Sequence, residues 1–191
     1  MKHLSAALLA AAVVACSSTP SGPYRTPADG DRDPAKAEKL AREGADLVKS
    51  QPDQAEALLR EALTADLFCG PAHNNLGVLF LREGNLYEAA HEFEWARKLM
   101  PGTPIPRTNL ALTLERAGHF KEALAAYDSA LEVAPEHVPS MQGSARLRAR
   151  MGDSSGRLRE MARLIALRGE TTEWREWARG QVIRLTSGAP P

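Results

Sequence analysis

Residues 70–103 read GPAHNNLGVLFLREGNLYEAAHEFEWARKLMPGT, and residues 104–137 read PIPRTNLALTLERAGHFKEALAAYDSALEVAPEH. The two stretches align over 34 residues without a gap, and they share apolar, small and turn-forming residues at matched positions. The matched pairs are Leu76 and Leu110, Phe80 and Leu114, Gly84 and Gly118, Ala89 and Ala123, Phe93 and Tyr127, Ala96 and Ala130, and Pro101 and Pro135. A fixed period that recurs at this many positions indicates a repeat architecture, so this spacing decides the fold.

Both the period and the residues resemble the tetratricopeptide repeat, a hairpin of two helices. Leu76, Gly77 and Phe80 fall where that repeat has its first helix, and Gly84 falls at its turn. Glycine permits a tight turn, small residues let the two helices approach closely, and large residues fill the space between hairpins. The resemblance implies an all-α fold, an antiparallel helix-hairpin solenoid wound as a right-handed superhelix. We expect three to four hairpins plus a C-terminal capping helix.

Upstream of these two units the pattern diverges. Residues 35–69 keep Ala55, Leu59 and Ala62 in the 34-residue register of the second helix. Their first helix matches only when it is shifted by one residue, which places on the inner stripe Leu40, Gly44 and Leu47. We expect a divergent first hairpin here.

Downstream the pattern degenerates. Residues 138–171 keep Gly152 at the turn but have Arg157 where a small residue is expected. We interpret them as a degenerate fourth hairpin, so that the repeat region covers 35–171. Residues 172–191 contain an amphipathic segment that would cap the stack, because every solenoid end leaves an apolar face uncovered. Its large apolar residues are Trp174, Trp177, Ile183 and Leu185.

The first residues of the chain have the features of a targeting signal. After the cationic start Met1-Lys2-His3, residues 4–15 form a weakly polar-to-apolar run. As a helix this run would extend about 18 Å, too short for a bilayer core of about 30 Å, so we predict a signal peptide over residues 1–15. The segment Val13-Val14-Ala15-Cys16 resembles a bacterial lipobox. That resemblance implies a lipid (palmitate-type) anchor on Cys16; a secretory signal with a chance cysteine is the alternative.

Residues 16–34 would join this anchor to the folded body. They are rich in Pro, Gly, Ser and Asp and contain one aromatic residue, so they cannot bury enough surface to fold and indicate a flexible tether. Two or more fatty chains hold a protein stably at a membrane. The lipobox resemblance therefore implies a lipid-anchored protein of the cell envelope. In bacterial lipoproteins an Asp after the cysteine tends to retain the protein at the inner membrane. Because Ser17 stands at this position, the resemblance implies the outer membrane, with the body facing the periplasm.

The composition excludes several function classes. The net charge is zero, which gives no indication of a nucleic-acid partner. The two cysteines and five histidines form no CxxC or HxxxH cluster, so we expect no metal site, no cofactor and no small-molecule substrate. We expect Cys69 to behave as a half-buried small hydrophobe, and His73 to lie in hairpin packing or on the surface.

The resemblance also implies a binding surface. In tetratricopeptide domains the first helices line a concave groove, in which asparagines often hold the backbone of an extended peptide. The repeat register gives the candidate groove residues, namely Asn74, Asn75, Val78 and Leu81 in one hairpin and Thr108, Asn109, Leu112 and Arg116 in the next. For Asn75 and Asn109 a role in starting a helix is the alternative. The cations with which some family members clamp a terminal carboxylate are missing, which argues against that type of site.

A second candidate surface is arginine-rich. From Met141 to the end there are ten arginines against five acidic residues, a local excess of five positive charges. This pattern is typical of a solvated helix face. The alternative is docking to an acidic protein patch or to anionic lipid head groups.

These observations predict a non-enzymatic, membrane-anchored adaptor for other proteins of the bacterial envelope. Pilus, secretin or other envelope assemblies are the processes in which such an adaptor would act. No convergent set of nucleophile, base and orienting group is visible in the sequence. A structural spacer without a binding groove, or an accessory subunit of a cell-wall enzyme complex, are the alternatives.

Overall fold

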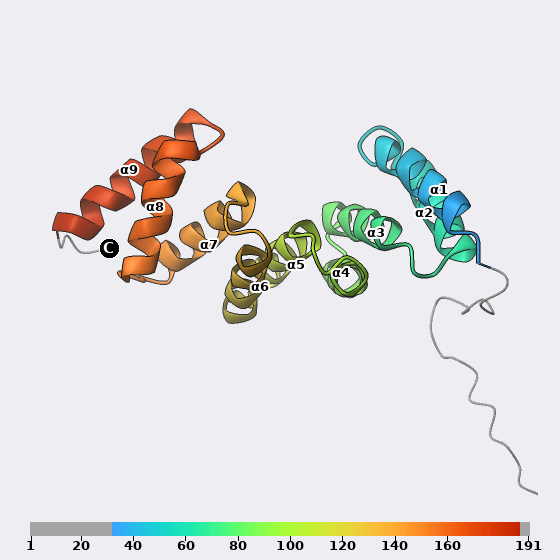
Figure 1. Cartoon of the computed structure of the whole chain (residues 1–191), viewed down its shortest axis with the longest axis horizontal. Coiled ribbons are helices and arrows are strands. Elements are labelled where there is room, and N and C mark those ends of the chain that lie inside the picture. Colours follow the sequence, from blue (N-terminus) through green and yellow to red (C-terminus); the bar gives the residue numbers. More distant parts are fainter. Residues whose placement is uncertain (1–31, 188–191) are drawn as a thin grey trace, which may run out of the picture.

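The computed structural model describes residues 32–187, and this part of the chain consists of nine α-helices without a strand (Figure 1). The helices are α1 (Pro34–Leu47), α2 (Pro52–Ala65), α3 (Gly70–Glu83), α4 (Leu86–Leu99), α5 (Ile105–Arg116), α6 (Phe120–Val133), α7 (Val138–Arg150), α8 (Gly156–Arg168) and α9 (Thr172–Ser187). The predicted all-α fold is confirmed. The predicted signal peptide, Cys16 and the tether as far as residue 31 lie outside the described residues.

Successive helices pair into hairpins: α1 with α2, α3 with α4, and α5 with α6. Each hairpin then stacks on the next, because its second helix packs against the following first helix. The result is a solenoid in which a unit contacts mainly its neighbours along the chain. None of the helices within residues 32–187 combines the length and the apolar character that crossing a bilayer requires.

Glycine sets the turn inside three of the hairpins. Gly84, Gly118 and Gly152 have φ angles of 85°, 84° and 76°, and no other described residue has a positive φ. A side chain is strained in this left-handed conformation, so glycine ends each first helix and redirects the chain. The 34-residue spacing of these glycines is therefore a requirement of the backbone.

Within each hairpin the two helices approach where a small residue faces a large one. A Cβ atom placed on Gly77 would lie 2.7 Å from the ring of Phe93, and one placed on Gly44 would lie 2.8 Å from Cγ of Leu59. Phe93 and Leu59 are a repeat length apart, whereas the two glycines are closer by one residue. This difference is the one-residue shift that the sequence indicates for the first helix of residues 35–69.

The fourth hairpin departs from the others because its turn is longer. Helices α4 and α6 begin two residues after Gly84 and Gly118, whereas α8 begins four residues after Gly152. The side chain of Ser155 caps α8 by accepting a hydrogen bond from the amide of Leu158. The buried stripe of α8 then falls one residue later than the repeat register, on Leu158, Ala162 and Ile165.

Helix α9 packs along α8 at the end of the stack. Ala178 and Leu185 of α9 are buried in one cluster with Met161 and Ile165 of α8. Trp174 and Trp177 pack against the same cluster and meet edge to face, with ring centroids 5.4 Å apart.

Candidate protein-binding groove

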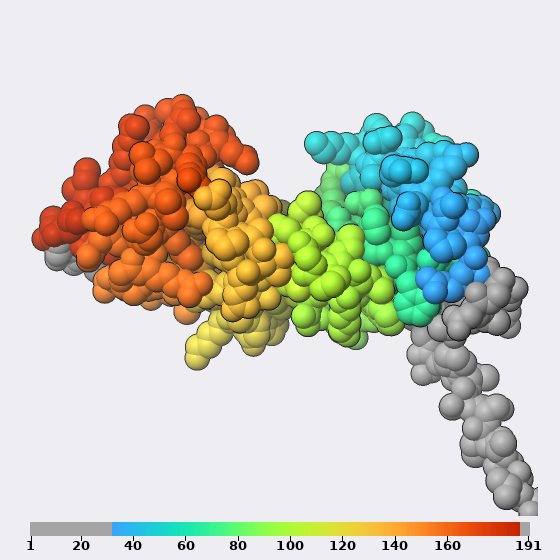
Figure 2. Space-filling model, in the orientation of Figure 1, coloured from blue at the N-terminus to red at the C-terminus, as the bar shows by residue number. Residues whose placement is uncertain are grey.

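The first helices of the hairpins form the inner side of the solenoid. Helix α1 contacts α3, α3 contacts α5, and α5 contacts α7, so these helices form a continuous row. In Figure 1, the second helices α4 and α6 lie below the row of first helices α3, α5 and α7. Figure 2 shows a hollow between the α1–α2 end and the α8–α9 end of the molecule, with the middle of the chain as its floor. The geometry is that of an open groove.

Hydrogen bonds from the side-chain amides of α3 and α5 connect three first helices. Asn109 Nδ2 donates to Asn74 Oδ1 at 3.1 Å, and Asn74 Nδ2 donates to Asn75 Oδ1 at 3.3 Å. Asn75 Nδ2 in turn lies 3.5 Å from the carbonyl oxygen of Ala41, at the long limit of a hydrogen bond. All three asparagines are part-exposed, so they retain donors and acceptors that a bound peptide backbone could use.

Two arginines form a second row of contacts at the other end of these helices. Arg82 donates to the carbonyl of Val48 at the end of α1, and Arg116 donates to the carbonyl of Leu81 near the end of α3 at 3.1 Å. A cation is favourable here because the last carbonyls of a helix lack helical partners and carry the negative end of its dipole. Arg116 is among the groove residues predicted from the sequence and Arg82 is not, although the two are one repeat length apart.

The remaining candidates occupy different environments. Val78 and Leu112 are part-exposed and pack with one side against the core. Thr108 donates to Pro104 O at 2.9 Å, and its hydroxyl lies 2.6 Å from that of Ser140 on α7. Leu81 belongs to the core instead, because its side chain is only 6% exposed at the end of α3 that Arg116 reaches over. It can therefore offer little contact area to a partner.

Two histidine contacts have the residue types of a catalytic pair but are packing interactions. His137 Nδ1 lies 2.6 Å from Ser140 Oγ at the start of α7, yet Ser140 is fully buried and no substrate can reach its hydroxyl. Burial lowers the pKa of His137. His73 is also fully buried; its Nδ1 lies 2.6 Å from Glu92 of α4, and its ring stacks on Trp95. His73 therefore joins the two helices of its hairpin, as expected.

The described residues contain no group of three or more metal-ligating side chains. Cys69 is 5% exposed, more deeply buried than the half-buried position expected from the sequence, and burial raises the pKa of its thiol. A buried thiol with a raised pKa is unreactive, because the thiolate is the nucleophile.

Comparison with known proteins agrees with this geometry. The family model of the tetratricopeptide repeat matches residues 45–98 and 108–160. Among curated proteins, the chain is similar to the probable UDP-N-acetylglucosamine–peptide N-acetylglucosaminyltransferase SPINDLY of Hordeum vulgare, with 31% identity over 118 residues. That match covers 58% of this chain but only 12% of the barley protein, so it concerns a small part of the transferase.

Solved structures share the fold at low sequence identity. The structure of pilF from Pseudomonas aeruginosa matches with a TM-score of 0.67 and 18% identity, covering 82% of this chain and 76% of that one. The first tetratricopeptide domain of Spaghetti (RPAP3), solved with the HSP90 peptide SRMEEVD, matches with a TM-score of 0.59 and 17% identity. It covers 63% of this chain and 97% of the Spaghetti chain.

Proposed function

Because this chain belongs to the tetratricopeptide repeat family, whose members bind other proteins, we propose that it is an adaptor that holds a segment of a partner protein in its inner groove. The observation that carries the proposal is the row of part-exposed side-chain amides on α3 and α5 beside the apolar side chains of Val78 and Leu112. Amides can pair with an extended backbone, while the apolar side chains add contact area.

We further propose that the adaptor acts in the bacterial cell envelope. The proposal rests on the lipobox-like segment Val13-Val14-Ala15-Cys16 and on the Pro- and Gly-rich residues 16–34. A lipid on Cys16 would hold the body at the outer membrane, on the periplasmic side, and the partner would be another envelope protein. Assembly of a pilus, a secretin or another envelope complex is the class of process that fits an anchored scaffold.

The anchor is tested by changing the cysteine. Cys16→Ser removes the thiol that would carry the lipid, so we expect labelling by radioactive palmitate to disappear and the protein to leave the membrane fraction. Cys69→Ser is the matched control, because this buried thiol should not be a lipid acceptor. Unchanged palmitate labelling of Cys16→Ser would disprove the anchor.

The groove is tested with a pair of amides. A partner is first identified by photocrosslinking from position 112, inside the groove, and then its affinity for Asn75→Ala with Asn109→Ala is measured. We expect a loss of more than about 1 kcal/mol of binding free energy, because a few central residues dominate most interfaces. The melting temperature should fall by only a few degrees, since each neutral hydrogen bond contributes about 1 kcal/mol.

The control removes two amides from the outer surface. Gln54→Ala with Asn85→Ala changes exposed residues on α2 and before α4 and should leave the affinity unchanged. Equal affinity in both double variants would place the partner outside the groove, and an absence of any groove crosslink would favour a spacer.

A further inference from the structure

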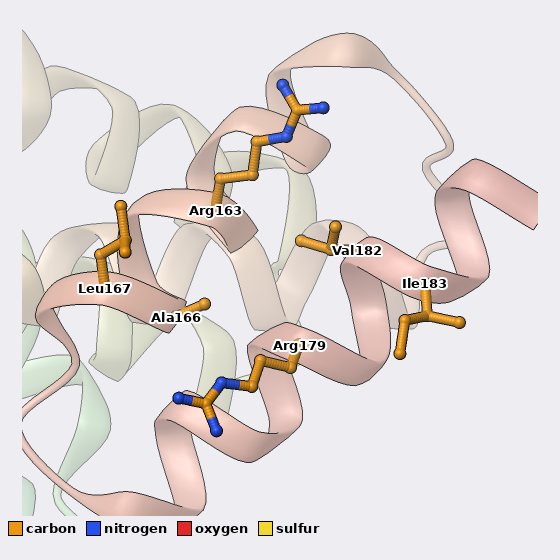
Figure 3. Close-up of a pocket in the computed structure, with 6 residues that line it drawn as sticks. All are labelled: Arg163, Ala166, Leu167, Arg179, Val182 and Ile183. Carbon is orange, nitrogen blue, oxygen red and sulfur yellow. The ribbon is translucent and has the colours of Figure 1, made fainter.

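An uncovered apolar cleft lies between α8 and α9, at the end of the solenoid far from α1. Its volume is about 500 Å³, and it is lined by Arg163, Ala166 and Leu167 of α8 and by Arg179, Val182 and Ile183 of α9 (Figure 3). Leu167 is 78% exposed and Ile183 is 66% exposed, the two most exposed aliphatic side chains among the large hydrophobic residues that the structure describes. Exposed apolar groups gathered in one cleft mark a binding surface rather than scattered surface residues.

The repeat itself shows what fits such a cleft. Helices α4 and α5 form the equivalent junction two units earlier, and there α6 packs against α5 and lines one side of the groove between α4 and α5. Leu114 of α5 packs in one cluster with Ala126 of α6, and Glu122 of α6 lines the same groove as Arg97 of α4. Val182 follows Leu114 by two repeat lengths and takes its place on α9. Within residues 32–187, however, no helix takes the place of α6 over α8 and α9.

The charges at the cleft define the chemistry of its occupant. Arg163 has one ion pair, with Glu160 of its own helix at 3.9 Å, and Arg179 has no hydrogen bond or ion pair among residues 32–187. In Figure 3 the two guanidinium groups point to opposite sides of the apolar side chains. The surface therefore offers an apolar strip with a positive charge on each side. A helix with small and apolar residues on one face and carboxylates beside them complements it.

We propose that the α8–α9 cleft binds an acidic amphipathic helix of a partner protein, which packs along α9 and borders the cleft as α6 packs along α5 and borders the groove between α4 and α5. A symmetric pair of copies would place the arginines of one copy against a surface whose charged residues are the same two arginines, and like charges across an interface are unfavourable. The cleft is shallow, and its lining has the small Ala166 beside larger apolar side chains, so it suits the side chains of a helix better than a flat lipid surface. This second site goes beyond the proposed function, because it does not use the inner groove.

The experiment uses α6 itself as the probe. A fluorescent peptide of residues 119–134 carries three acidic residues and one lysine, and it already has the face that fits such a junction. Its binding is followed by fluorescence anisotropy with the whole chain carrying Cys16→Ser, so that no lipid competes. We expect Leu167→Ser with Ile183→Ser to weaken binding at least about tenfold. Arg163→Glu with Arg179→Glu should weaken it as well, by a factor that shrinks as salt is raised.

Two control variants change equivalent residues elsewhere. Tyr87→Ser removes an apolar side chain that is 81% exposed on α4, and Arg42→Glu with Lys49→Glu reverses exposed charges in the first unit. Neither variant should change the affinity for the peptide, and circular dichroism should be the same for all variants because every changed residue is exposed.

Equal binding of the peptide by all variants, or no binding, would overturn the proposal. It would also be overturned if the cleft variants instead abolished self-association or binding to phosphatidylglycerol vesicles while the peptide did not bind. The groove variants at Asn75 and Asn109 do not enter this test, so the two proposals fail separately.

Discussion

Individual residues set how closely the helices of neighbouring units can approach. A Cβ atom on Gly143 would lie 2.4 Å from the ring of Tyr127, a distance that real side chains do not reach. Gly143 has no special backbone conformation, because it lies in the middle of α7. Its role is to leave room for the tyrosine ring, and a helix would otherwise favour alanine there.

We therefore predict that Gly143→Ala destabilises the protein by about 1–3 kcal/mol, because the ring must move to accept the methyl group. Gly180→Ala is the control, since Gly180 lies in the exposed part of α9 and has no atom within 4 Å of its added Cβ. That change should stabilise the protein by about 0.5–1 kcal/mol through helix propensity. Urea unfolding measures both, and a change of the same sign in both variants would contradict the packing.

A second residue-scale feature is the ion pair that fastens Arg32 to the first hairpin. Arg32 Nε donates to Asp66 Oδ1 at 2.9 Å and Arg32 Nη2 donates to Oδ2 at 3.1 Å, while the guanidinium lies over the ring of Phe68. These hydrogen bonds hold the pKa of Asp66 below its ordinary value. The paired carboxylate is nearly buried, and Asp33 adds a backbone hydrogen bond to Ala65.

A lowered pKa gives this pair a defined dependence on pH. The carboxylate stabilises the fold fully above its unfolded pKa of about 3.9, and the contribution is lost as pH falls through the lower folded pKa. We expect Arg32→Met to cost about 1 kcal/mol at pH 6, and the difference from the wild type to shrink below pH 4. Lys39→Met, which removes an exposed pair with Glu43 at 3.8 Å, should have little effect at either pH. A pH-independent loss in Arg32→Met would show that packing on Phe68, rather than charge, is what matters.

At the scale of elements, the fourth unit shows how a longer turn changes a helix. Because α8 starts later after its glycine, position 157 no longer faces the core. Arg157 instead reaches Asp128 of α6 at 3.0 Å, beside Arg148, which contacts the same carboxylate at 2.6 Å. The arginine that breaks the repeat pattern is thus an ion-pair partner of the preceding unit.

The shifted register predicts a large loss of stability from a substitution at position 162 and a small one from a substitution at position 157. Ala162→Leu should lower the free energy of unfolding by about 1–3 kcal/mol, because Ala162 is fully buried on α8 and leaves no room for a larger side chain. Arg157→Ala should cost no more than about 1 kcal/mol, the value of an exposed ion pair. With an unshifted register the alanine at 157 would be stabilising and the leucine at 162 tolerated. Thermal unfolding of the two variants distinguishes these cases.

At the scale of the whole molecule, the sequence predicts what recurs and misses what depends on three-dimensional proximity. The spacing of Gly84, Gly118 and Gly152 predicts three turns, and all three adopt the left-handed conformation. The contact between Asn109 and Asn74 was not predictable, because it depends on how far one hairpin rotates on the next. The α8–α9 cleft was not predicted for a related reason. In the sequence Leu167 and Ile183 are ordinary apolar residues of amphipathic helices, and only the packing of the helices leaves them exposed in one cleft.

The inner row of hydrogen bonds also gives the molecule a mechanical direction. The bonds from Asn75 to Ala41, from Asn109 to Asn74, and from Arg82 and Arg116 to the preceding helix ends all connect first helices. These hydrogen bonds lie on the inner side of the curved solenoid. Pulling the two ends of the solenoid apart would stretch each of them, whereas increasing its curvature would not. We therefore expect the solenoid to resist opening more strongly than it resists a further increase in curvature. A force that increases the curvature would therefore close the groove around a bound segment rather than open it.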